Sequence, residues 1–122
     1  MPTVGCMARA PRILRAGGIY HVIGRSSPEL RLFVDGADRD WFADGLRRAA
    51  GRYRWQIVEF TLLGTHYHMV VRTNEPTLDR GLQWLHGTYA QRCNRLRGRF
   101  GPLFAGRYKA FLIESERYLQ AA

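Results

Sequence analysis

The order of apolar patterns along the chain constrains the fold more than any single motif does. Two segments carry apolar residues at helical spacing, and segments rich in β-branched and aromatic residues lie on either side of each. We predict one helix of about fourteen residues beginning near Asp38, with Asp38 or Asp40 in its first turn, and another beginning at Pro76 or Thr77. The predicted strands are 17–25, 55–63, 66–72 and 108–113.

The two helical segments each place one apolar stripe against a common core. The second stripe excludes Arg80, His86, Arg92 and Arg95, which fall on other faces of that helix. A short apolar run at 30–34 is either strand-like or irregular. The stripes consist of Phe42, Leu46, Ala49 and Tyr53 in the first helix, and of Leu78, Leu82, Leu85, Tyr89 and Cys93 in the second.

This order of elements predicts an α+β fold, the ferredoxin-like βαββαβ arrangement. Four antiparallel strands would form one sheet with two helices on one face, followed by a truncated third helix that starts at 114–116. The first and third strands are central neighbours in such a sheet, so His21 is expected beside the 66–72 strand. We interpret 1–16 as a basic leader and 17–122 as a single domain, incomplete at its C-terminus.

The sequence His66-Tyr67-His68 follows a tight turn at Gly64. Successive side chains of a strand alternate between faces, so both imidazoles would point to one side of the sheet. Two converging neutral imidazoles are a good partial shell for a divalent metal ion. For an arbitrary pair of this spacing, two hydrogen-bonded strand histidines without a metal are the commoner situation.

The formal charge of +9 comes almost entirely from arginine. Eighteen of the nineteen basic residues are arginine, and Lys109 is the exception. Arginine matches phosphate oxygens with a planar fork of donors and stacks on bases, so the charge favours a nucleic-acid partner. An arginine-rich surface that is merely solvated is the other interpretation.

The cysteines and the hydropathy pattern indicate the cellular location of the protein. Cys6 and Cys93 form neither a disulfide framework nor a thiolate metal site, so a reduced, cytoplasmic protein is expected. No apolar run reaches the roughly 20 residues that a membrane span needs, and the N-terminus lacks the apolar segment of a signal peptide.

A series of short motifs lies at 18–22, 65–68, 81–85 with 89–90, 94–95 and 101–110. Together these motifs resemble the HUH single-tyrosine transposases, in particular the branch associated with repetitive extragenic palindromes. The resemblance runs from about Ala8 to the last residue, in the order of that family. Thr65 departs from it, because the family commonly has asparagine before the first histidine.

The resemblance implies an enzyme that cleaves and rejoins single-stranded DNA at a hairpin through a phosphotyrosine intermediate. His66 and His68 would ligate Mg²⁺ or Mn²⁺. The attacking tyrosine would lie on the third helix, one to two turns past Tyr118, and therefore after Ala122. Tyr118 is the other candidate nucleophile, although a packing role fits its position better. We therefore expect a chain that binds metal and DNA but does not cleave by itself.

Further residues are candidates for metal binding beside His66 and His68, or for DNA binding. His21 would be a third ligand, a hydrogen-bonding neighbour or a core histidine, and Glu59 a ligand or a surface charge. The partner would be single-stranded or hairpin DNA, bound by a monomer or a homodimer. A nucleic-acid-binding module that catalyses no reaction and a purely structural fragment are the alternative interpretations of the function.

A group of basic residues and one tyrosine are the candidates for DNA binding. Phe100 and Phe104 would either stack on bases or pack in the core, and Arg12 and Arg15 would extend the basic patch. The DNA-binding candidates are Arg25, Arg95, Arg97, Arg99, Arg107, Lys109 and Tyr108.

Overall fold

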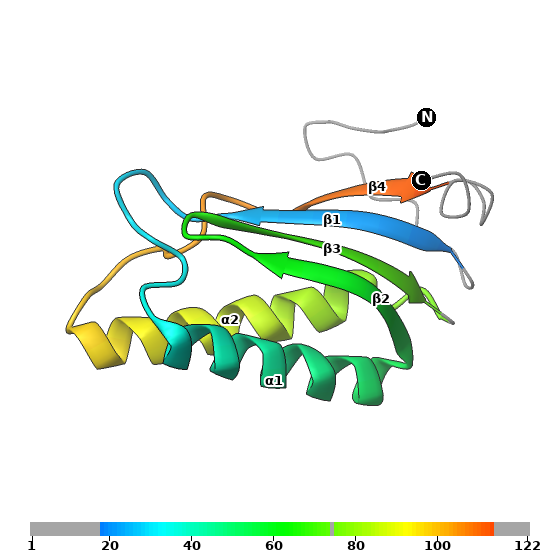
Figure 1. Cartoon of the computed structure of the whole chain (residues 1–122), viewed down its shortest axis with the longest axis horizontal. Coiled ribbons are helices and arrows are strands. Elements are labelled where there is room, and N and C mark those ends of the chain that lie inside the picture. Colours follow the sequence, from blue (N-terminus) through cyan, green and yellow to red (C-terminus); the bar gives the residue numbers. More distant parts are fainter. Residues whose placement is uncertain (1–17, 74, 114–122) are drawn as a thin grey trace.

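The structure, a computed structural model, describes residues 18–73 and 75–113, which form four strands and two helices (Figure 1). The sheet has the order β2-β3-β1-β4 with antiparallel neighbours throughout, and both helices cover one of its faces. The elements are β1 (Ile19–Arg25), α1 (Gly36–Tyr53), β2 (Trp55–Leu62), β3 (His66–Thr73), α2 (Leu78–Arg97) and β4 (Lys109–Ile113).

The predicted ferredoxin-like α+β arrangement is confirmed, including the central position of β1 and β3. His21 lies opposite Val70 in the register, two residue pairs away from the pair Ile23 and His68 and therefore on the same face of the sheet. The predicted leader 1–16 and the third helix that was expected from 114 lie outside the described residues.

Helix α1 begins earlier than we predicted and is 18 residues long. Its N-cap is Asp35, whose side chain accepts a hydrogen bond of 2.9 Å from the backbone N–H of Asp38. Asp38 lies in the first turn, as predicted. The helix nevertheless begins at Gly36, because the capping carboxylate is that of Asp35, which satisfies an otherwise unpaired N–H of the first turn. The apolar run 30–34 is irregular, and its Leu32 and Phe33 are buried.

The core lies between the sheet and the two helices. Both predicted stripes are buried, and they meet the strand residues that face the helices. Burial of a large apolar side chain contributes about 2 kcal/mol, so this layer supplies most of the driving force for folding. The fully buried side chains include Val22, Met69 and Val71 from the sheet and Phe42, Leu46, Leu82, Leu85 and Tyr89 from the helices.

A buried carboxylate joins the start of α1 to the end of α2. The side chain of Asp38 is 1% exposed and accepts hydrogen bonds from Arg92 (2.7 Å), Arg97 (2.9 Å) and the backbone N–H of Val34 (2.9 Å). Burial by itself would raise the pKa of Asp38. The hydrogen bonds from Arg92 and Val34 and the charge of Arg97 outweigh it and lower that pKa below its ordinary value.

Two further features concern Cys93 and the hydropathy of the helices. Cys93 is buried and is not part of a disulfide. In the part of the chain that the structure describes, neither helix has the long apolar stretch that crossing a membrane requires.

We expect Asp38→Asn to lower the free energy of unfolding by about 2–3 kcal/mol, because it removes the anion of partly buried Arg92 and leaves Arg97 with only Asp35, at 4.0 Å. Asp44→Asn is the matched control. Asp44 pairs with Arg48 on the solvent side of α1, both side chains are more than half exposed, and its loss should cost less than about 0.5 kcal/mol. Urea unfolding followed by tryptophan fluorescence measures both variants, and equal effects would contradict the structural role of Asp38.

Candidate metal and nucleic-acid site

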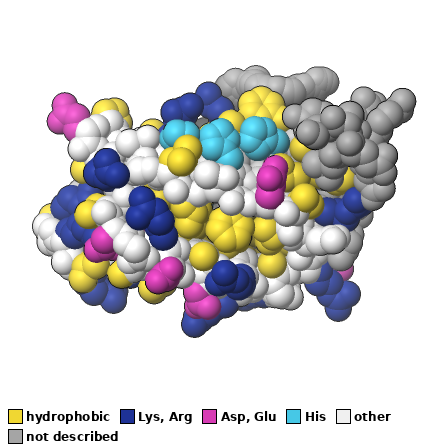
Figure 2. Space-filling model, in the orientation of Figure 1, with side chains coloured by type: hydrophobic (Ala, Val, Ile, Leu, Met, Phe, Trp, Pro, Cys, Tyr) yellow, Lys and Arg dark blue, Asp and Glu magenta, His cyan; other side chains and the backbone are white. Residues whose placement is uncertain are grey.

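Strand β3 divides its side chains between the core and the open face of the sheet. Tyr67, Met69 and Val71 are buried toward the helices, whereas His66 and His68 alternate with them and are half-buried on the opposite face. Figure 2 shows histidine side chains gathered in a row there, with basic side chains beside them. The predicted placement of the two imidazoles on one face is therefore what the structure has.

The imidazoles of His66, His68 and His21 form a continuous cluster. The ring centroids of His66 and His68 are 4.9 Å apart at 75°, and those of His21 and His68 are 5.4 Å apart and stacked. Nε2 of His21 lies 3.2 Å from Nδ1 of His68, a hydrogen-bond distance, so one of these nitrogens carries the shared proton. Nδ1 of His66 is 3.3 Å from the hydroxyl of Thr65.

The electrostatics of the cluster favour neutral imidazole at His68. Burial lowers the pKa of His68, and the nearby His66, His21 and Arg25 lower it further. A neutral ring has a lone pair available for a metal ion, which an imidazolium lacks.

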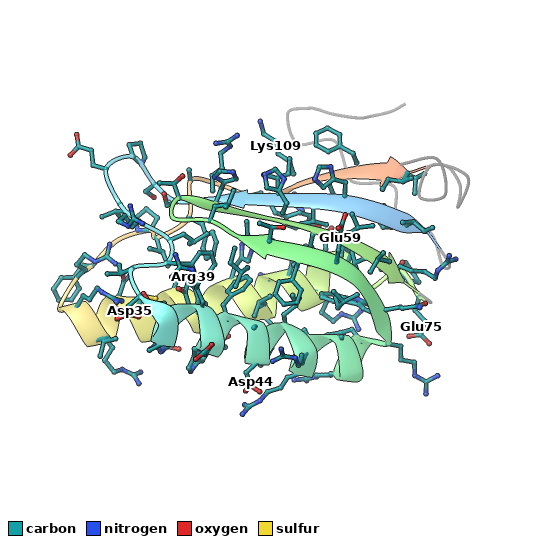
Figure 3. The ribbon with its side chains drawn as sticks, viewed as in Figure 1. Asp35, Arg39, Asp44, Glu59, Glu75 and Lys109 are labelled. Atoms are coloured by element: carbon teal, nitrogen blue, oxygen red, sulfur yellow. The ribbon has the colours of Figure 1, made fainter. Side chains whose placement is uncertain are left out.

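Basic side chains lie next to the histidines on the open face. Arg25 is directly opposite His66 in the β1–β3 register, and Ile23 is opposite both His68 and Lys109 in its two neighbouring strands. Residues opposite each other in an antiparallel pair point to the same face. Figure 3 shows Lys109 projecting away from the helices, as this register requires. Two positive charges thus flank the imidazoles, where a phosphate would be attracted.

The donors present would supply only part of the ligands of a metal ion. With Nδ1 of His66 near Thr65 and Nδ1 of His68 near His21, the Nε2 atoms of both rings are the atoms left for a metal ion. Among residues 18–73 and 75–113, however, no group of three or more His, Cys, Asp and Glu side chains is arranged to hold a metal. Such a site suits a cation whose other ligands are water or phosphate oxygens, as Mg²⁺ and Mn²⁺ allow.

Some arginines of the predicted DNA-binding cluster form ion pairs within the protein, and others do not. Arg97 pairs with Asp38, and Arg107 pairs with Asp79 at 3.0 Å. Arg95 is exposed and Arg99 half-exposed, and neither forms an ion pair with another described residue.

The aromatic residues between positions 100 and 108 also differ from one another in burial. Tyr108 is buried and its hydroxyl donates to Asp79, so its ring cannot stack on a base without leaving the core. Phe104 is buried as well, whereas Phe100 is fully exposed. The core interpretation therefore holds for Phe104 and does not hold for Phe100.

Beneath the histidine pair, Tyr67 holds β3 to α2. Its hydroxyl oxygen lies 2.6 Å from Nε2 of His86, and the His86 ring stacks on Phe104 with centroids 3.9 Å apart. The Tyr67 ring also packs against Gly24, where a Cβ would lie 2.4 Å from a ring carbon, so this position in β1 requires glycine. These contacts fix the backbone between the two candidate ligands.

Sequence reasoning missed His86 and Asp79 because both lie off the apolar stripe of α2. His86 was placed on an exposed face, but it reaches the core through Tyr67, and burial lowers its pKa to about 4. Asp79 anchors Arg107 and Tyr108 from the first turn of α2. An aromatic residue between two histidines, which needs a partner for its hydroxyl, was the available signal for His86.

No tyrosine of the described part of the chain is placed to attack a phosphate at the histidines. Tyr20, Tyr53, Tyr67, Tyr89 and Tyr108 are all buried. Tyr118, the candidate nucleophile, lies outside the described residues, and so does any tyrosine later in the protein.

Comparison with solved structures identifies two transposases of similar fold. A REP-associated tyrosine transposase bound to a REP hairpin matches with a TM-score of 0.75 and 10% sequence identity, over 94% of this chain and 67% of that one. A protein from Deinococcus radiodurans R1 assigned as a transposase matches with a TM-score of 0.64 and 18% identity, over 93% and 92% of the two chains. The chain has the fold of these transposases. No protein-family model and no curated protein matches the sequence.

This transposase fold is expected to lose stability in acid through His86. The folded state holds its imidazole neutral with a pKa of about 4, whereas in the unfolded chain the pKa is about 6.5. Between these values the unfolded state binds the extra proton, so the free energy of unfolding falls as the pH drops from about 6.5 to 4, by up to about 3 kcal/mol. The contribution of Asp38 is lost only below about pH 4, through a pKa that folding lowers.

Urea unfolding at pH 7, 5.5 and 4.5 measures this slope. His86→Gln should flatten it, whereas Tyr67→Phe removes the same hydrogen bond, keeps the buried imidazole and should retain the slope. An unchanged slope in His86→Gln would show that other groups cause the loss.

Proposed function

We propose that this chain is the DNA-binding and metal-binding part of a metal-dependent single-stranded DNA transposase that works through a phosphotyrosine intermediate. The observation that carries the proposal is the placement of His66 and His68 side by side on the open face of a central strand, flanked by Arg25 and Lys109. The transposase fold of the chain supports it. In this arrangement a site for a divalent cation, at His66 and His68, would lie next to a site for phosphate, at Arg25 and Lys109.

In this function Nε2 of His66 and of His68 would hold Mg²⁺ or Mn²⁺. Such a cation, when bound, offsets the negative charge of a phosphodiester and so makes it a better electrophile. Nε2 of His21 lies 3.2 Å from Nδ1 of His68. If it accepts the Nδ1 proton of His68, it would hold His68 in the tautomer whose Nε2 has no proton. This is a positioning role, and we assign it to His21 in preference to direct ligation.

Arg25 and Lys109 would bind the phosphates on either side of the scissile one. A tyrosine hydroxyl attacks that phosphorus, the new O–P bond forms, and the bond to the 3′ oxygen breaks to leave a 3′-hydroxyl after protonation. Reversal of the same steps rejoins the strand without ATP. The structural relative of 10% identity is bound to a REP hairpin, and we propose a DNA hairpin with single-stranded flanks as the partner of this chain as well.

The burial of every described tyrosine favours one alternative, a module that binds the hairpin and does not cut it. The two functions differ in a covalent product. Only the transposase forms a protein–DNA adduct through a tyrosine, whereas both bind DNA in a salt-sensitive way.

Mn²⁺-dependent nicking of a labelled hairpin by the complete encoded protein tests the proposal. A covalent adduct that survives denaturing electrophoresis is expected for the wild type, and His66→Ala should abolish it while reducing hairpin binding less than threefold. Tyr118→Phe should keep the adduct if the nucleophile lies further along the protein. Hairpin binding without an adduct in Mn²⁺ would establish the non-cleaving module instead.

A second experiment tests the positioning role of His21. We expect His21→Phe, which keeps a ring but no hydrogen-bonding nitrogen, to weaken Mn²⁺ binding about 10-fold by isothermal titration calorimetry. Nitrogen-15 shifts of the His68 ring should show a single tautomer in the wild type and a mixture in the variant. Thr61→Ala is the control, because Thr61 is opposite His68 from the β2 side without a hydrogen bond to its ring among the described residues. Unchanged affinity and unchanged ring shifts in His21→Phe would exclude this role.

A further inference from the structure

Phe100 is the most exposed large apolar residue in the described part of the chain. Its side chain is 99% exposed. It lies in the segment 98–102, which leaves the end of α2 at one end of the molecule (Figure 1). Isolated exposed apolar residues are common on protein surfaces, so exposure alone assigns no role.

The backbone around Phe100 is held rigidly by Asn94. The carbonyl of Asn94 accepts hydrogen bonds from the backbone N–H groups of Gly98 and Arg99, the latter at 2.9 Å. The Asn94 side-chain amide donates to the carbonyl of Gly101 at 2.8 Å. We call these three hydrogen bonds the Asn94 clamp. Gly98 and Gly101 have φ of 62° and 92°, conformations that glycine adopts without strain.

The residues that follow Phe100 in the chain are also held by hydrogen bonds. Ser27 donates from its hydroxyl to the carbonyl of Pro102 at 2.8 Å and from its N–H to the carbonyl of Leu103 at 2.7 Å, and Leu103 is buried. The fold thus holds both neighbours of Phe100 in place while its ring stays in water. A rigid loop presents the ring at little entropic cost to a ligand, which favours binding.

The positive charge near the Phe100 ring indicates which kind of ligand it would bind. From Arg92 to Ile113 the chain has six basic residues and no acidic one. Arg95 lies on the last turn of α2 and Arg99 directly precedes Phe100, and neither is in an ion pair with the rest of the described chain. An aromatic ring among unpaired guanidinium groups is typical of sites where nucleic-acid bases stack and phosphates are neutralised. A duplex hides the faces of its bases, so the complementary ligand is an unpaired base.

We propose that Phe100, held by the Asn94 clamp, is a stacking site for an unpaired nucleotide base, with Arg95 and Arg99 contacting the adjoining phosphates. The proposal rests on the proposed function for the choice of DNA as the partner, but it requires no cleavage. It adds a base-recognition point, separate from the histidines, that distinguishes hairpin or single-stranded DNA from a plain duplex.

Fluorescence anisotropy with two labelled oligonucleotides tests the stacking site. One is a DNA hairpin with an unpaired four-nucleotide loop and a single-stranded flank, and the other is a blunt duplex with the stem sequence. Phe100→Leu, which keeps apolar area but removes the ring, should weaken hairpin binding about 5- to 100-fold and leave duplex binding unchanged. Phe100→Tyr should bind the hairpin like the wild type. Leu96→Ala is the matched control, because Leu96 is 61% exposed on the last turn of the preceding helix.

Asn94→Ala removes the one hydrogen bond of the clamp that the Asn94 side chain makes, the bond to the Gly101 carbonyl, and leaves the ring unchanged. It leaves every arginine and Phe100 in the chain, so a loss of hairpin affinity with normal duplex affinity would show that the presentation of the ring matters. 2-Aminopurine at each unpaired position in turn reports stacking directly, since its fluorescence falls when an aromatic ring stacks on it. Quenching by the wild type at one or more positions, absent in Phe100→Leu, is expected.

Equal hairpin affinity and equal quenching in the wild type and Phe100→Leu would overturn the stacking site. The proposed function would survive that result if His66→Ala still abolished the adduct. Failure of the wild type to bind either oligonucleotide at low salt would overturn both proposals.

Discussion

The alternation of side chains along β3 is the constraint on which the rest of this molecule depends. Because the side-chain period of a strand is two, burying Tyr67, Met69 and Val71 against the helices forces His66 and His68 onto the open face. A shift of one residue in register would exchange the two sets. The Tyr67–His86 hydrogen bond and the packing of Tyr67 on Gly24 oppose that shift, because both require this ring to point inward.

The same register brings the charges to the imidazoles. Arg25 lies beside His66 because β1 pairs directly with β3, and Lys109 lies on the same face one strand further along, where β4 pairs with β1. The carboxylate of Asp38 then holds the start of α1 against the end of α2, and it engages Arg97, an arginine that DNA could otherwise have bound. Core ion pairs thus decide which members of a very basic sequence are available to a ligand.

Periodicity in the sequence predicted the fold and the histidine face, because both follow from local rules. Element order fixed the sheet topology, and the apolar stripes fixed the faces of the helices. The start of α1 could not be located as well, because it depends on which of three nearby aspartates caps it. The environments of Arg97, Arg107, Tyr108 and His86 depend on residues distant in sequence, such as Asp38, Asp79 and Tyr67. No local pattern contains that information, and for the same reason Phe100 and Phe104 could not be told apart.

In the proposed function, the binding of DNA and its cleavage would depend on different residues. Every tyrosine that the structure describes serves the core, and the hydroxyls of Tyr67, Tyr89 and Tyr108 are committed to His86, the carbonyl of Leu32 and Asp79. Burial raises the pKa of Tyr67 and Tyr89 far above the ordinary value, which makes their hydroxyls poor nucleophiles. In the proposed transposase, the attacking tyrosine would therefore come from outside 18–73 and 75–113. Because strands β1, β3 and β4 carry the imidazoles and the flanking charges, the proposed binding of metal and phosphate would not require that tyrosine, whereas the proposed cleavage would.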